Sequence, residues 1–156
     1  MRWTADNVSY AVAKDLYPWR RYVVVPNVSW GLLPHEADLV ALSEAGWLTE
    51  IEVKVSKGDF LADRDKWKHQ RAKVNGAPEL ISDFYYAMPL SVWERCKPED
   101  LPEGAGLILC SREDWDHEPR ARVTQKATSN PLARKLTDAE REQLLRLGYL
   151  RFWGRQ

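Results

Sequence analysis

The hydrophobic pattern of the chain is clearest between positions 35 and 55, where two alternating runs, 35–42 and 47–55, flank a short segment that ends in Gly46. Alternation with a period of two places successive side chains on opposite faces of a strand. A gap of this length that ends in glycine is typical of a hairpin loop. We therefore predict two strands joined by a tight turn.

The two faces of the second predicted strand have opposite character. One face is core-like and carries Thr49, Ile51, Val53 and Val55. The other face carries Leu48, Glu50, Glu52, Lys54 and Ser56. Three ionisable groups in a row are costly to bury unless something binds them. Two readings stay open at this point: a solvated hairpin whose charges pair at the surface, and a site that holds a ligand.

Periodicity also predicts the elements before and after this hairpin. They are a helix over 4–17, a strand over 22–25, a helix over 56–73, a strand over 83–89, a short helix over 91–96, a strand over 106–110, an edge strand over 120–124 and a helix over 137–148. Ser56 with Asp59 and Thr137 with Glu140 have the spacing of capping boxes at helix starts. The aromatic segment 149–156 is expected to dock on the body of the protein. The pattern as a whole favours an α/β fold.

Composition limits the class of protein. At 156 residues, 44% hydrophobic and 29% charged, the chain is expected to form a single globular domain over residues 1–156. Its two cysteines, Cys96 and Cys110, are too few for a disulfide framework and lack the spacing of a metal site, which favours buried thiols. We find neither a signal peptide nor a membrane-spanning run, so we expect a cytoplasmic protein with no membrane partner.

Charge is balanced in total but not in distribution. The 23 Lys and Arg residues equal the 23 Asp and Glu residues, yet segments 66–73 and 119–136 are basic and contain no acid. Such segregation allows a cationic face for nucleic acid on a neutral protein, although charge runs are also common on solvated helices. The candidate nucleic-acid-binding residues are Lys57, Lys66, Lys68, His69, Arg71, Lys73, Arg120 and Arg122.

A divalent cation is the natural ligand for the polar strand face. Asp38 on the first strand and Glu52 on the second can meet across the hairpin and supply the hard oxygen ligands that Mg²⁺ prefers. Lys54 shares the face of Glu52 and would contact a phosphate or an attacking nucleophile. Glu36 and Glu50, each two residues from a principal ligand, are second-rank candidates for a second metal or a water. Solvent-facing carboxylates are an equal alternative for both.

The residues around this pattern resemble the PD-(D/E)XK nuclease superfamily, and more closely its small bacterial MmcB-like DNA repair family with phage-encoded relatives. The matching segments are Ala37-Asp38, Glu52-Val53-Lys54, Ser56-Lys57-Gly58-Asp59-Phe60-Leu61, Ala87-Met88-Pro89 and Ala105-Gly106-Leu107-Ile108. The resemblance covers residues 34–110 and is weak before 30 and after 118. Some members carry a metal-positioning glutamate in the first helix; this chain has only Asp6 and Asp15 there, so that role is not transferred.

The resemblance implies a restriction-endonuclease-like core, a central mixed β-sheet flanked by helices in α-β-β-β-α-β order. It implies a metal-dependent DNA endonuclease or repair nuclease that leaves a 5′-phosphate and a 3′-hydroxyl. Asp38 and Glu52 would bind Mg²⁺ or Mn²⁺ with the backbone carbonyl of Val53, and Lys54 would be catalytic. DNA would be the partner, and a homodimer is possible because many relatives cut both strands as dimers.

Two other classes of function remain open. The chain is alternatively a nucleic-acid-binding protein that keeps the nuclease fold but is inactive alone or needs a partner. It is also compatible with an interaction module whose polar strand face is solvated.

Overall fold

The structure is a computed structural model that describes residues 2–29, 31–72, 79–112 and 117–154, with the side chains of 67–72 left undescribed. Its centre is a six-stranded sheet in the order β1-β2-β3-β4-β5-β6. In chain order the elements are α1 (Ala5–Leu16), β1 (Tyr22–Val28), β2 (Ala37–Ser43), β3 (Leu48–Val53), α2 (Lys57–Ala72), β4 (Ile81–Pro89), α3 (Leu90–Trp93), the 3₁₀ turn η1 (Pro98–Asp100), β5 (Gly106–Arg112), β6 (Pro119–Gln125) and α4 (Asp138–Trp153).

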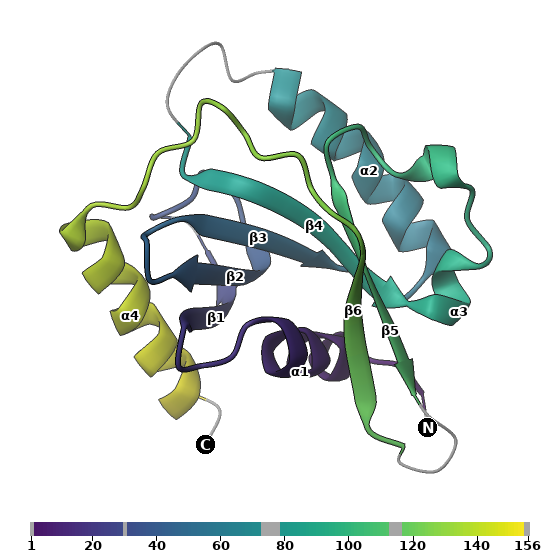
Figure 1. Cartoon of the computed structure of the whole chain (residues 1–156), viewed down its shortest axis with the longest axis horizontal. Helices are drawn as coiled ribbons and strands as arrows, with labels where there is room; N and C mark the ends of the chain where they lie inside the picture. The colour runs from purple at the N-terminus through teal and green to yellow at the C-terminus, as the bar shows by residue number, and fades with distance from the viewer. Residues whose placement is uncertain (1, 30, 73–78, 113–116, 155–156) are drawn as a thin grey trace.

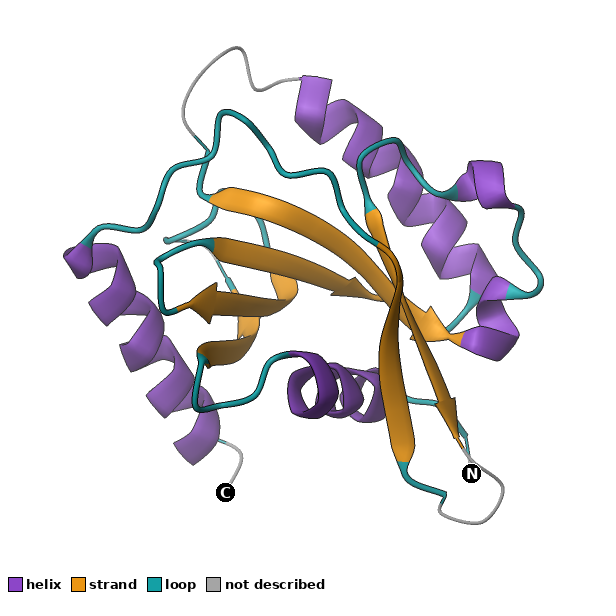
Figure 2. Cartoon of the chain, in the orientation of Figure 1, coloured by secondary structure: helices purple, strands orange, loops and turns teal. Residues whose placement is uncertain are grey.

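The sheet is mixed. β1, β2 and β3 pair antiparallel, β3, β4 and β5 pair parallel, and β6 is antiparallel to β5. The parallel steps follow from the helical connections, because a crossover through α2 or α3 returns the chain to the same end of the sheet. Figure 2 shows the helices arranged around this layer of strands. The predicted α/β fold with a mixed sheet flanked by helices is confirmed.

Helix α1 covers one face of the sheet. Val8, Ala11 and Val12 of this helix are fully buried against a cluster that includes Ile51 and Val53 of β3. These two residues are the apolar positions that alternation placed on the core face of the strand. The prediction also put Val55 on this face, and that was wrong: β3 ends at Val53, and Val55 is 37% exposed beyond it.

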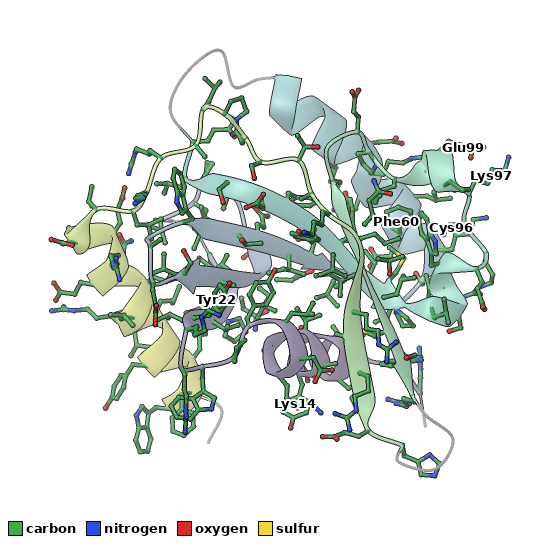
Figure 3. All side chains as sticks on the ribbon, in the orientation of Figure 1. Lys14, Tyr22, Phe60, Cys96, Lys97 and Glu99 are labelled. Carbon is green, nitrogen blue, oxygen red and sulfur yellow. The ribbon has the colours of Figure 1, made fainter. Side chains whose placement is uncertain are left out.

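The opposite face is covered by two separate groups of helices. α4 packs Leu144 over Val25, Val40 and Leu48, at the β1–β3 side. α2 packs Phe60 over a second cluster built on β4 and β5. Figure 1 shows α4 and α2 toward opposite ends of the sheet, and Figure 3 shows Phe60 between α2 and the strands. The end of β3 that carries the polar residues therefore lies between two apolar clusters.

The central hairpin forms as predicted. Ser43 N–H donates to the carbonyl of Trp47 at 3.0 Å, and Gly46 adopts φ +94°, a conformation that glycine reaches at little cost. The predicted capping box at Thr137 is also present, since its hydroxyl accepts from the N–H of Glu140 and the Glu140 carboxylate accepts from the N–H of Thr137.

Helix α4 is longer than predicted. The sequence suggested a stop at Gly148 and an aromatic tail docked on the body, but the helix continues to Trp153, and Tyr149, Phe152 and Trp153 are exposed. Gly148 serves packing instead: a Cβ there would lie 3.2 Å from Cγ2 of Val25, tighter than an ordinary contact. A single glycine inside a helix costs about 1 kcal/mol, too little to end it here.

Within the described residues, no helix is long and apolar enough to cross a membrane.

Candidate functional site

The candidate site lies where β2 and β3 stop pairing. Their register runs from Leu42 opposite Leu48 to Leu39 opposite Ile51. Asp38 and Glu52 are the next residues on the two strands. The Val53 N–H donates to Oδ2 of Asp38 at 2.8 Å, so a side chain replaces the backbone partner at this point. This bond fixes one carboxylate beside the polar end of β3.

Three ionisable side chains follow one another along the polar face of β3, and two of them are almost fully buried. Glu50 is 4% exposed and Lys54 is 6% exposed. Burial of unpaired charges costs several kcal/mol, so each must have partners. The alternative of a solvated hairpin whose charges pair at the surface does not fit Glu50 and Lys54, because both side chains are buried.

Lys54 is held between two carboxylates. Its Nζ lies 2.8 Å from Oε1 of Glu52 and 3.4 Å from Oδ1 of Asp63 on α2. The other oxygen of Asp63 accepts a 3.0 Å hydrogen bond from the hydroxyl of Tyr86, a fully buried residue of β4. The result is a continuous polar chain from Tyr86 through Asp63 and Lys54 to Glu52.

The electrostatics of this chain are unusual for surface residues. Burial, and then the negative charge of Asp38, raise the pKa of Glu52 to about 7, while the hydrogen bond from Lys54 opposes the rise. Burial alone would lower the pKa of Lys54, but its hydrogen bond with Glu52 and the charges of Glu52, Asp63 and Asp59 raise it. Lys54 is therefore an ammonium ion at neutral pH, whereas Glu52 titrates near neutrality. A carboxylate whose pKa is raised by the charge of a second carboxylate marks a place that suits a cation.

Glu50 has a different partner. Nε2 of His35 lies 2.8 Å and 2.9 Å from its two carboxylate oxygens. This hydrogen bond is the largest of the causes that raise the pKa of His35, and burial opposes it. Glu36 is exposed and, together with Glu50, lines a hollow at the protein surface. Glu50 therefore has a structural partner, whereas Glu36 is a solvent-facing carboxylate at the rim.

Two hollows border the site. One is lined by Glu50, Glu52, Asp63 and Lys66, together with His35, Glu36 and Phe84. The other lies beside α1 and is lined by Asp38 and Val53, together with residues of α1 and β1. Asp38 and Glu52 thus open toward different sides of the β2–β3 strand ends, although the charge of Asp38 is strong enough at Glu52 to raise its pKa.

The donor set fits a hard divalent cation in its chemistry. Asp38 and Glu52 offer carboxylate oxygens, and the bond from Val53 occupies only Oδ2 of Asp38. Mg²⁺ sites commonly use one or two carboxylates and leave other positions to water and phosphate. Among the described residues, no group of three or more His, Cys, Asp or Glu side chains is arranged to hold a metal. A metal here would accordingly use two carboxylates and backbone or water oxygens.

The predicted basic residues do not form one surface around the site. Lys66 lines the hollow beside Glu52, and the Lys57 ammonium donates to the carbonyl of Arg95. Arg120, in an ion pair with Glu118 at 3.3 Å, and exposed Arg122 lie on β6, three strands from β3. The side chains of Lys68, His69 and Arg71, and all of Lys73, fall outside the described part of the chain.

Sequence reasoning missed Asp63, Tyr86 and the role of His35. A signal for Asp63 was present, because Asp59 and Asp63 are four residues apart and share a face of α2. That face meets Lys54. Tyr86 and His35 could not be found in the same way, since their contacts span 23 and 15 positions of sequence.

Comparison with known proteins shows the fold but no function. No protein-family model matches the chain, and no curated protein matches it either. The chain is similar in structure to the SPO1766 protein of unknown function from Silicibacter pomeroyi, with a TM-score of 0.61 and 22% sequence identity. The match covers 97% of this chain and 87% of that protein. It therefore extends over nearly the whole fold.

Proposed function

We propose that this protein is a metal-dependent phosphodiesterase of the PD-(D/E)XK type that cleaves DNA. The observation that carries the proposal is the cluster of Asp38, Glu52 and Lys54 at the point where β2 and β3 separate, with Glu52 at a pKa of about 7. The mixed sheet flanked by helices supports it, because the sequence resemblance implies a core of this kind.

In this proposal Asp38 and Glu52 hold Mg²⁺ or Mn²⁺ with the Val53 carbonyl. The bound metal would lower the pKa of a water and stabilise negative charge on phosphate oxygens. Lys54 has the position and charge to orient the attacking water and to neutralise charge developing on the phosphate. It cannot itself be a ligand, since an ammonium group has no acceptor.

Asp63 and Tyr86 act in this proposal as positioning residues. Lys54 has a second carboxylate partner at 3.4 Å, so it can leave Glu52 without becoming a buried unpaired charge. Tyr86 keeps Asp63 in place through its 3.0 Å hydrogen bond. Glu52 would then be free to hold a metal while Lys54 remains at the site.

The direct test is cleavage of supercoiled plasmid and single-stranded DNA by the purified protein with Mg²⁺. Asp38→Ala and Glu52→Ala are each expected to abolish cleavage and to keep the circular dichroism spectrum of the folded protein. Glu44→Ala, an exposed carboxylate of the β2–β3 turn, is the matched control and should cleave normally. Equal cleavage by all the variants would show that a contaminating nuclease, and not this site, is responsible.

One observation favours a second candidate, a DNA-binding protein of this fold that is inactive alone. Lys54 is bonded to Glu52 at 2.8 Å, an arrangement that competes with a metal for the same oxygen. Under this alternative the pure protein binds DNA without cleaving it, with or without Mg²⁺ or Mn²⁺. The cleavage experiment therefore separates the two.

A further inference from the structure

The C-terminal half of α4 exposes an unusual amount of apolar surface. Tyr149, Leu150 and Phe152 are 65%, 63% and 64% exposed, and Leu145 and Trp153 are each 52% exposed. Scattered single apolar residues are normal on a protein surface, but a contiguous group on one helix end marks an interaction site. The aromatic rings also contact one another, since the centroids of Phe152 and Trp153 are 5.4 Å apart.

Grooves run along both flanks of this half-helix. The first is formed by residues 23–26 of β1 and by α4 residues that include Leu145, Tyr149 and Phe152. The second is formed by Ser29 and Leu32 and by α4 residues that include Arg146 and Leu150. Figure 1 shows α4 beside β1, which is an edge strand of the sheet. We call the two grooves and the exposed end of α4 the α4 surface.

The segments that line the α4 surface are free of acid. Arg151 lines the first groove and Arg146 the second, and among the described residues neither groove is lined by an Asp or Glu. Arg146 is 77% exposed and pairs only weakly with Glu142 of the preceding turn, as an i,i+4 surface pair. In a chain of zero net charge, this local excess of arginine makes the α4 surface complementary to an anion.

The α4 surface is connected to the candidate site. Leu32 lines the second groove, and His35, three residues further along the same segment, lines the hollow beside Glu52. The second groove and the hollow are therefore lined by neighbouring positions of one segment.

We propose that the α4 surface binds single-stranded nucleic acid, with bases stacked on Tyr149, Phe152 and Trp153 and phosphates near Arg146 and Arg151. Exposed aromatic rings combined with arginine are the usual means of binding unpaired strands. In duplex DNA the base faces are stacked on one another, so they cannot stack on the exposed aromatic rings of α4. The inference extends the proposed function by naming the form of DNA that reaches the site, but the binding itself needs no cleavage.

Two other occupants fit the surface less well. A second copy of the chain would bring two arginine-bearing, acid-free surfaces together, which like-charge repulsion disfavours. An anionic lipid surface is flat, whereas much of the apolar area here lines grooves on either side of the helix. Self-association and lipid binding can each be measured separately from binding of nucleic acid.

The test is fluorescence anisotropy of a fluorescein-labelled oligothymidylate titrated with protein in metal-free buffer. The double variant Tyr149→Ala, Phe152→Ala should bind about tenfold more weakly, the scale of losing one stacked base. Arg146→Glu should lower the slope of log affinity against log salt by about 0.7 for each phosphate that the variant no longer neutralises. Leu132→Ala and Arg2→Glu, which alter an exposed apolar and an exposed basic residue outside the α4 surface, are the matched controls and should bind as the parent does.

Several results would overturn the inference. These are unchanged oligothymidylate affinity in the α4 variants, a loss confined to co-sedimentation with phosphatidylserine vesicles, and a loss confined to self-association in sedimentation velocity. The outcome is separate from that of the proposed function. If the protein binds oligothymidylate through α4 but does not cleave DNA with Mg²⁺, this inference holds and the proposed nuclease function fails. If it cleaves DNA and the α4 variants bind as the parent does, the nuclease function holds and this inference fails.

Discussion

The two faces of β3, a strand of six residues, have opposite environments: one packs in an apolar cluster and the other carries ionisable side chains. Ile51 and Val53 pack under α1 in a continuous apolar cluster, where burial stabilises the fold. Glu50 and Glu52, one position away on the other face, line a hollow beside α2, where burial of charge costs free energy. One face therefore holds the sheet together, and the other carries ionised groups that need partners such as His35 and Asp63.

The largest effect should come from the apolar face. Ile51→Ala removes a fully buried side chain under α1 and should lower the free energy of unfolding by about 2–5 kcal/mol. Mn²⁺ affinity of the molecules that stay folded should be unchanged. Urea denaturation measures the loss, and Val55→Ala, beyond the end of β3, should cost little. A small loss in Ile51→Ala would mean that α1 is not packed on this face.

Lys54→Met tests the polar face and should change turnover rather than stability. It keeps the volume of the stem and removes the ammonium, so turnover should fall roughly a hundredfold or more, as when one preorganised electrostatic group is lost. Mn²⁺ should bind as well or better at pH 8.5, where Glu52 is ionised. Lys54→Arg should restore little, because a guanidinium is broader than a point charge. Full activity in Lys54→Met, measured on radiolabelled duplex and single-stranded DNA, would contradict the proposed mechanism.

The same contrast explains what the sequence could predict. The hairpin, the apolar positions Ile51 and Val53, and the Thr137 capping box depend on local patterns of turn, alternation and cap, and all were found. The burial of Glu50 and Lys54 was not predicted, because it depends on contacts with His35 and Asp63, which lie outside the alternating run of β3. The end of α4 was misplaced because Gly148 is needed for close approach to Val25, a contact that no local pattern contains.

Glu52→Gln should sharpen the comparison by making the metal-free protein more stable. The pKa of Glu52 is raised from 4.5 to about 7, so the folded state binds this proton more tightly than the unfolded state does. Its contribution to stability is therefore lost as pH rises from 4.5 to 7. At pH 8 the variant should gain about 1–3 kcal/mol over the parent, and at pH 4 it should gain almost nothing. An equal gain at both pH values would show that the buried charge is not the cause.

Asp63→Asn should have the smallest effect. The amide can still accept from Tyr86 but no longer balances Lys54, which then stays on Glu52 and competes with the metal. Mn²⁺ affinity should fall a few fold, on the order of 1 kcal/mol, and the fall should vanish in a Lys54→Met background. Asp65→Asn, which alters a 67% exposed neighbour on the same helix, is the control. A fall that persists without the lysine would mean that Asp63 acts on the metal directly.

Calorimetric titration of Mn²⁺ into the protein at pH 8.5, for the parent, Asp38→Ala and Glu44→Ala, tests most directly whether the polar end of β3 is a metal site. We predict a saturable heat of binding in the parent and in Glu44→Ala, and its loss in Asp38→Ala, because an all-oxygen site that loses one of two carboxylates binds far more weakly. Equal binding by the parent and Asp38→Ala, or no binding by any of the three, would contradict the assignment.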